Sequence, residues 1–124
     1  MLNASMLSII EEAGTAVLIL TEGLEEAELL GSRLTRAEAS RQVGIVAETA
    51  ANLPEQTRAV LAEVDWNGWE SVARRLDAGG GAADEALWFA VRSLVPAVLM
   101  WLRVYRQNQP ELFAYTTAAA SGES

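Results

Sequence analysis

The stretch that decides the fold is residues 84–107, DEALWFAVRSLVPAVLMWLRVYRQ, near the end of the 124-residue chain. Its apolar side chains return every three or four positions, the period of a helix with one buried face. Asp84 is suited to cap a helix over residues 85–107, and Pro96 predicts a kink in it because proline lacks a backbone N–H. The stripe expected to face the core is Leu87, Trp88, Val91, Leu94, Val95, Val98, Leu99, Leu102 and Tyr105.

The same spacing predicts further helices upstream, over residues 5–20, 35–53, 55–63 and 66–77. Thr35 and Glu38 have the spacing of a capping box, and Asp65 is a candidate N-cap. An acidic turn over residues 25–30 and a loop at the glycines 79–81 are expected between helices. Four main helices with short connections predict an all-α fold, an up-and-down four-helix bundle with a kinked long C-terminal helix.

Composition sets the class and the compartment. Apolar residues make up 51% of the chain and charged residues 21%, so we expect one globular domain over residues 1–115 and a flexible tail over 116–124. The chain has no cysteine, and Glu11 and Glu12 interrupt the apolar start, which favours a cytoplasmic protein without a leader. Residues 87–104 contain Arg92 and Pro96, so we interpret them as a buried helix, with no membrane association.

Charge and residue types limit the chemistry. All nine basic residues are arginines, and seventeen acidic residues outnumber them, giving a net charge of −8. This balance argues against a free-standing nucleic-acid binder, because phosphate neutralisation requires cationic surface. The chain has no histidine, and no pattern in it indicates a metal site or a cofactor.

The aromatic residues of the last helix are candidates for an interface. Trp88 and Trp101 are thirteen residues apart and so lie nearly on one side of the helix. Together with Tyr105 they are expected either to fill the core or to anchor an interface. The apolar surplus of this helix favours a homodimer.

Several segments, in order, carry a resemblance to a known family that covers about residues 5–106. The strongest is residues 43–54, VGIVAETAANLP, an apolar pair, a small residue, a glutamate, alanines and a leucine-proline. The others are residues 21–24 (TEGL), 32–36 (SRLTR), 64–66 (VDW), 84–88 (DEALW) and 95–96 (VP).

In these segments the chain resembles the HepT-like family, the toxin half of bacterial and archaeal toxin-antitoxin pairs. The resemblance implies a helical bundle, a metal-independent ribonuclease activity, and silencing by an MntA-like nucleotidyltransferase antitoxin that transfers AMP to a tyrosine. It also implies a structural role inside the bundle for Glu48, the family's glutamate.

The family's active motif is an arginine, four to six residues, a histidine, one residue and a tyrosine. Counted from Arg74 or Arg75, the possible motif remnants, the histidine falls within residues 79–82 and the tyrosine within 81–84, where this chain has glycine, alanine and aspartate. Histidine normally exchanges the proton in such cleavage near neutral pH. Tyr105 and Tyr115 lie downstream of the motif and are expected to serve packing, not modification.

Three functions follow as alternatives. The first is a HepT-like protein without ribonuclease activity that acts by dimerisation or by binding a nucleotidyltransferase-type partner. The second is a divergent ribonuclease that uses Arg74, Arg75 and a carboxylate such as Asp77 or Asp84; it binds RNA and depends on a divalent metal. The third is a helical homodimeric adaptor unrelated to toxins.

Overall fold

The computed structural model describes residues 2–114, and the tail expected over residues 116–124 lies outside them. Helices make up most of the described chain, which contains no strand, so the all-α class is confirmed. The elements are α1 (Leu2–Thr21), α2 (Glu26–Gly31), α3 (Arg33–Asn52), α4 (Glu55–Val60), α5 (Trp66–Ala78), α6 (Gly80–Phe89), the π-helical turn η1 (Ala90–Leu94), α7 (Val95–Asn108) and the 3₁₀ turn η2 (Pro110–Phe113).

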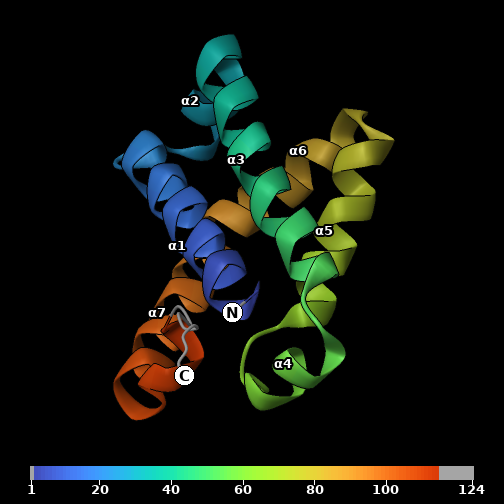
Figure 1. The fold of residues 1–124 in the computed structure, drawn as a ribbon. Coiled ribbons are helices and arrows are strands. Elements are labelled where there is room, and N and C mark those ends of the chain that lie inside the picture. The colour runs from blue at the N-terminus through green and yellow to red at the C-terminus, as the bar shows by residue number, and fades with distance from the viewer. Residues whose placement is uncertain (1, 115–124) are drawn as a thin grey trace.

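The main helices alternate in direction, as the up-and-down bundle requires (Figure 1). Helix α1 packs against α3, α3 against α5, α5 against α6, and α7 returns to α1, so the four rods enclose one core. The short helices α2 and α4 lie at opposite ends and connect the rods. The side chains completely withdrawn from solvent include Leu7, Ile10, Leu29, Leu61 and Leu102.

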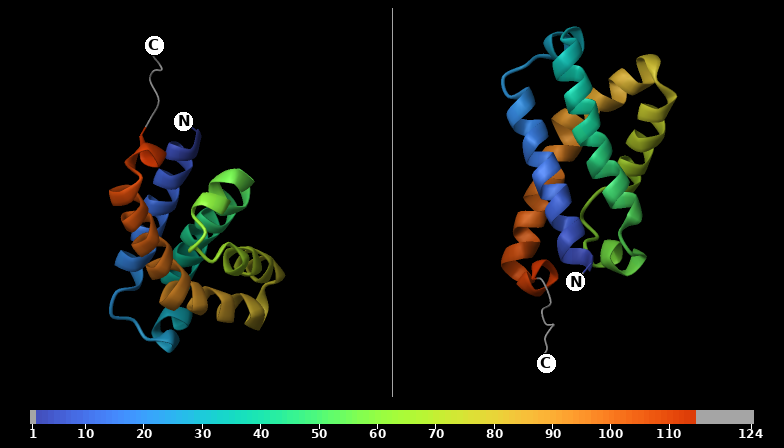
Figure 2. Two further views of the ribbon diagram at one scale, coloured as in Figure 1. Left: turned by 90° about the horizontal axis from the view of Figure 1, so that it is seen from below. Right: turned by 45° about the horizontal axis from the view of Figure 1, so that its top comes forward.

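The C-terminal rod is bent, as predicted, and the bend coincides with η1. The amide of Val95 donates to the carbonyl of Ala90, five residues back, where a regular helix would bond four back. Pro96 follows at once and has no N–H to offer, so the backbone widens before it. As a result α6 and α7 meet at a clear angle (Figure 2, left), and α6 contacts α5 while α7 contacts α1.

The glycines 79–81 form a corner, not the loop predicted. Only Gly79 stands outside a helix, and α6 begins at Gly80, five residues before the predicted start. Gly79 has φ 74° and ψ −175°, a conformation that is essentially restricted to glycine. Gly80 also has a positive φ, of 64°, so these two glycines reverse the chain between α5 and α6, and Gly80 and Gly81 belong to the first turn of the helix.

The connection between α1 and α3 also differs from the prediction. The acidic turn is the helix α2, in which the Glu25 amide donates to Glu28 Oε1 at 2.8 Å. Helix α3 begins at Arg33, because the extended Ser32 supplies the N-cap and its Oγ accepts from the Thr35 amide at 3.4 Å. The predicted capping box of Thr35 and Glu38 is therefore wrong.

The connection from α4 to α5 is held by two side chains. Asp65 caps α5 as predicted, accepting from the Gly68 amide at 2.8 Å. The indole Nε1 of Trp66 donates to the carbonyls of Arg58 at 3.1 Å and Leu61 at 3.0 Å. These bonds satisfy carbonyls at the end of α4, which ends three residues earlier than predicted.

Two helical stretches, Asn3–Thr21 and Gly80–Asn108, are long and apolar enough to cross a membrane by length and composition alone. The core helices of soluble proteins pass the same test. Here both stretches contribute to the core, since α1 packs against α7 and α6 packs against α5.

The conformation of Gly79 gives a stability test. Replacing Gly79 with alanine places a Cβ where φ is positive, and we expect a loss of about 1–3 kcal/mol in the free energy of unfolding. Gly81→Ala is the matched control, because Gly81 lies in α6 with open space around it and no positive φ, so alanine should be neutral or stabilise by up to about 1 kcal/mol. Urea unfolding measures both, and equal midpoints would contradict the assigned corner.

Candidate functional site

The end of α5 and the start of α6 form the place where the sequence predicts remnants of an active motif. Arg74 Nη1 lies 3.8 Å from Glu70 Oε1, one turn earlier in α5, and both side chains are mostly exposed. Arg75 reaches across the corner, and its Nη2 donates to Glu85 Oε1 at 3.1 Å. The two arginines therefore form ion pairs at the surface and do not converge on one point.

A second ion pair reaches the same corner from α3. Arg36 Nη2 lies 2.6 Å from Asp84 Oδ1, and both side chains are partly exposed. Asp84 and Glu85, neighbours in α6, thus bind arginines from two different helices. Because such exposed pairs contribute at most about 1 kcal/mol each, they add little to the stability of the fold.

The positions assigned to the motif histidine and tyrosine are held by glycines, alanines and one aspartate. Gly80, Gly81 and Ala82 are exposed and Ala83 is half-buried. Asp84, the only titratable residue among them, forms an ion pair with Arg36. Within residues 2–114, no three metal-binding side chains are grouped so that they could hold an ion.

A groove between α3 and α5 lies beside this corner. It has a volume of about 600 Å³ and small side chains on its α3 wall. Its polar lining consists of Arg41, Glu48 and Asp77. Glu48 is exposed, and within the described residues it forms no ion pair, so the expected role inside the bundle is wrong. Its helical position turns it toward solvent, away from buried Val46, Ala47 and Ala50.

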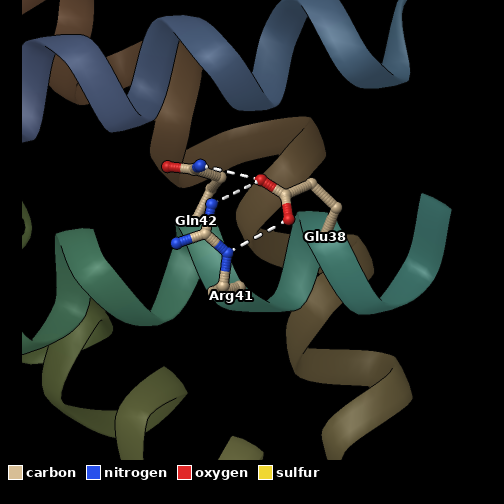
Figure 3. Close-up of polar contacts among 3 residues, drawn as sticks. All are labelled: Glu38, Arg41 and Gln42. Carbon is tan, nitrogen blue, oxygen red and sulfur yellow. Dashed lines mark hydrogen bonds and ion pairs between the residues drawn. The ribbon is translucent and has the colours of Figure 1, made fainter. Parts of the chain in front are cut away.

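Glu38 is the most strongly perturbed acid of the described chain, and it lies on the other flank of α3, facing α1 (Figure 3). Arg41 donates to its carboxylate from Nε at 3.0 Å and from Nη2 at 2.7 Å. Gln42 Nε2 adds a third hydrogen bond at 2.9 Å. The bonds from Arg41, and then that from Gln42, lower the pKa of Glu38 from 4.5 to about 2.

The aromatic candidates of the last helix separate into different environments. Tyr105 is only 8% exposed, so it belongs to the core and offers little surface to a partner. Trp101 is half-buried, with its ring centroid 6.4 Å from that of Tyr105. Trp88, also half-buried, lines a groove of about 500 Å³ between the end of α1 and the bent rod. The Cζ atom of Arg92 lies over the Trp88 ring, 5.5 Å from the ring centroid.

Two apolar residues, Ile19 and Leu34, are exposed although the sequence analysis does not predict this. Ile19 is 70% exposed and Leu34 is 84% exposed, although both sit in helices with a buried face. Their spacing from the buried residues predicts this exposure. Ile19 is two residues from buried Val17, and Leu34 is nine residues before buried Val43. In a helix, both spacings place the side chain on the side opposite the core.

No family model, no curated protein and no solved structure matches this chain.

The pKa of Glu38 gives a prediction for acid unfolding. Because folding lowers this pKa, the stabilisation from the Arg41 and Gln42 bonds is fully present above about pH 4.5 and is lost as the pH falls toward 2. Carboxyl carbon NMR should place the Glu38 midpoint below those of the other glutamates, and Glu38→Gln should make the loss of stability in this pH range shallower.

Glu63→Gln is the control, since Glu63 is exposed and outside the ion pairs of residues 2–114. A Glu38 carboxyl that titrates with the remaining glutamates would show that the bonds from Arg41 and Gln42 do not hold in solution.

Proposed function

We propose that this protein is a HepT-like bundle without ribonuclease activity, which acts in the cytoplasm by dimerisation or by binding a nucleotidyltransferase-type partner. The observation that carries the proposal is the composition of the corner after Arg74 and Arg75. Where the family has histidine and tyrosine, this chain has glycine, alanine and an aspartate paired with Arg36, and it has no histidine elsewhere.

The chemistry of RNA cleavage supports the loss of activity. A group that exchanges protons near neutral pH contributes a factor of about 10² to 10⁴, and histidine is its usual source. Arg75 does not supply that group, since a guanidinium stays protonated at neutral pH, and its side chain is engaged by Glu85. The absence of a tyrosine from residues 79–84 likewise removes the acceptor for AMP transfer, so a nucleotidyltransferase would act here as a binding partner only.

The groove at the end of α1 supports a binding role. Leu18, Leu24 and Val91 give it apolar walls, and Trp88 offers a half-buried indole. Aromatic side chains in such positions are the usual anchors of protein interfaces. Within our proposal, this groove is the surface that binds the nucleotidyltransferase-type partner.

Two measurements on the unmodified chain test the proposal. The purified protein should leave single-stranded RNA intact with and without a divalent metal, and its induction in cells should not arrest growth. Co-expression with the product of the neighbouring gene should give a stable complex by size-exclusion light scattering, and Trp88→Ala should weaken it at least tenfold. Matched Trp101→Ala should weaken it less.

The other two functions are outcomes of the same tests. Growth arrest by this chain alone, relieved by the neighbour, would identify a toxin that works without the family's histidine. Cleavage that requires a divalent metal would identify the divergent ribonuclease. A dimer with no affinity for the neighbour and no effect on RNA would identify an adaptor unrelated to toxins.

A restored motif tests the family resemblance itself. Gly81→His with Ala83→Tyr places both residues at a spacing that fits the family's motif from Arg74 or Arg75. Gly81 has open space and no positive φ, so the backbone admits a side chain there. We expect the double variant to gain RNA cleavage that Gly81→Gln with Ala83→Phe lacks.

A further inference from the structure

Within residues 2–114, no helix covers the outer face formed by α1 and α3 (Figure 1). Three of the six large apolar side chains that are exposed within residues 2–114 belong to it: Ile9 (42%), Ile19 (70%) and Leu34 (84%). Helices α1 and α3 run antiparallel and are joined by residues 22–32, so Ile19, near the end of α1, and Leu34, near the start of α3, lie at the same end of the bundle (Figure 1).

Ile19 borders two shallow hollows, and it also lines the groove that contains Trp88. One, of about 290 Å³, lies on the seam between the helices and is lined by Ala16, Ile19, Leu20, Glu38 and Gln42. The other, of about 390 Å³, lies along α1 and is lined by Glu11, Glu12, Thr15, Ala16 and Ile19. Glu38 in the seam is held by Arg41 and Gln42, so its charge is already compensated beside the apolar surface (Figure 3).

We propose that this face binds a second copy of the chain, with Leu34 of each copy seated in the hollows beside Ile19 of the other. A two-fold axis parallel to α1 and α3 places α1 of each copy opposite α3 of the other, so each copy offers the same projection and the same hollows, as a self-complementary interface requires. The proposal deepens the proposed function, on which it rests for the role of the dimer.

Charges around the face favour a second copy as its occupant. Arg33, next to Leu34, is exposed, and so are Glu12, on the same side of α1 as Ile19, and Glu22, in the turn that follows α1. Within the described residues none of the three forms an ion pair in its own chain. Placing Leu34 beside the partner copy's Ile19 brings each Arg33 near glutamates of the other chain, which offsets part of the repulsion between two molecules of net charge −8.

The size of the face is of the order that a dimer needs. Helices of 20 residues are about 30 Å long, and two of them side by side are about 20 Å wide, so the face presents on the order of 600 Å² in projection. Specific interfaces bury about 800 Å² of accessible surface per partner. Because the accessible area of a ridged surface is larger than its projected area, the two values are of the same order.

Light scattering after size exclusion, with sedimentation over a concentration series, tests the proposal on the full chain. The unmodified protein should be a dimer. Leu34→Glu and Ile19→Glu should each raise the dissociation constant roughly thirtyfold or more, the loss expected for a central apolar contact. Phe89→Glu is the control: Phe89 is 44% exposed on α6, and its replacement should leave the dimer unchanged.

Circular dichroism separates dissociation from unfolding. Ile19 and Leu34 point away from the core, so both variants should retain the helical signal and cooperative melting of the parent. A monomeric unmodified chain would overturn the proposal, and so would a dimer that survives both substitutions, since its interface would then lie elsewhere. A monomeric chain would also remove dimerisation from the proposed function, whereas RNA cleavage and binding of the neighbouring gene product are measured separately. Because Ile19 also lines the groove that contains Trp88, Leu34→Glu is the variant that separates loss of the dimer from loss of the partner.

Cross-linking tests the pairing itself, because the chain has no native cysteine. An equal mixture of Ile19→Cys and Leu34→Cys proteins, treated with oxidised glutathione, should form a disulfide between the two variants faster than either variant forms one with itself. Equal rates for the mixture and for the separate variants would exclude Leu34 from the hollows beside Ile19.

The charged rim gives a finer test. Arg33→Glu should weaken the dimer about two- to fivefold, the range of exposed ion pairs, and adding Glu22→Arg in the same chain should restore it. Equal weakening by Arg33→Glu and by the double variant would remove the charge argument for a second copy.

Discussion

The structure depends on one constraint: the C-terminal rod packs against two different helices, α5 and α1, and it bends between its two halves to contact both. Its first half, α6, lies against α5, and its second half, α7, lies against α1. The turn η1 and Pro96 provide the change of direction, since a proline that lacks an N–H removes the bond that would keep the helix straight. Buried Val91 and Leu94 in this turn keep the bend inside the core.

The bend also determines where the ion pairs of the corner and the groove beside Trp88 lie. By turning α6 toward α5, it sets Asp84 and Glu85 opposite Arg36 and Arg75, so the charged groups at the corner neutralise one another. It places Val91 and Arg92 beside the end of α1, where they and Trp88 line a groove. The corner therefore contains ion pairs between helices, whereas the groove leaves the half-buried Trp88 accessible.

Apolar spacing predicts most of the fold from the sequence, because burial of one helical face dominates the energy of a bundle this small. Residues 84–107 show both the stripe and the proline that bends it. Spacing is less informative at the ends of helices, where local bonds decide. Ser32, and not Thr35, caps α3. Gly79 and Gly80 both take a positive φ at the reversal, and nothing in the pattern distinguishes them from Gly81, which does not.

Less of the candidate site could be predicted. Arg74 pairs with Glu70 as its spacing within one helix indicates, but the pairs of Arg75 with Glu85 and of Arg36 with Asp84 cross between helices and depend on the tertiary arrangement. Tyr105, at a core spacing, is buried, so of the two roles predicted for it the structure shows the core. An apolar residue that breaks the core period is the more informative signal. Leu34 and Ile19 lie opposite the buried stripes of their own helices, so packing within one chain does not account for them.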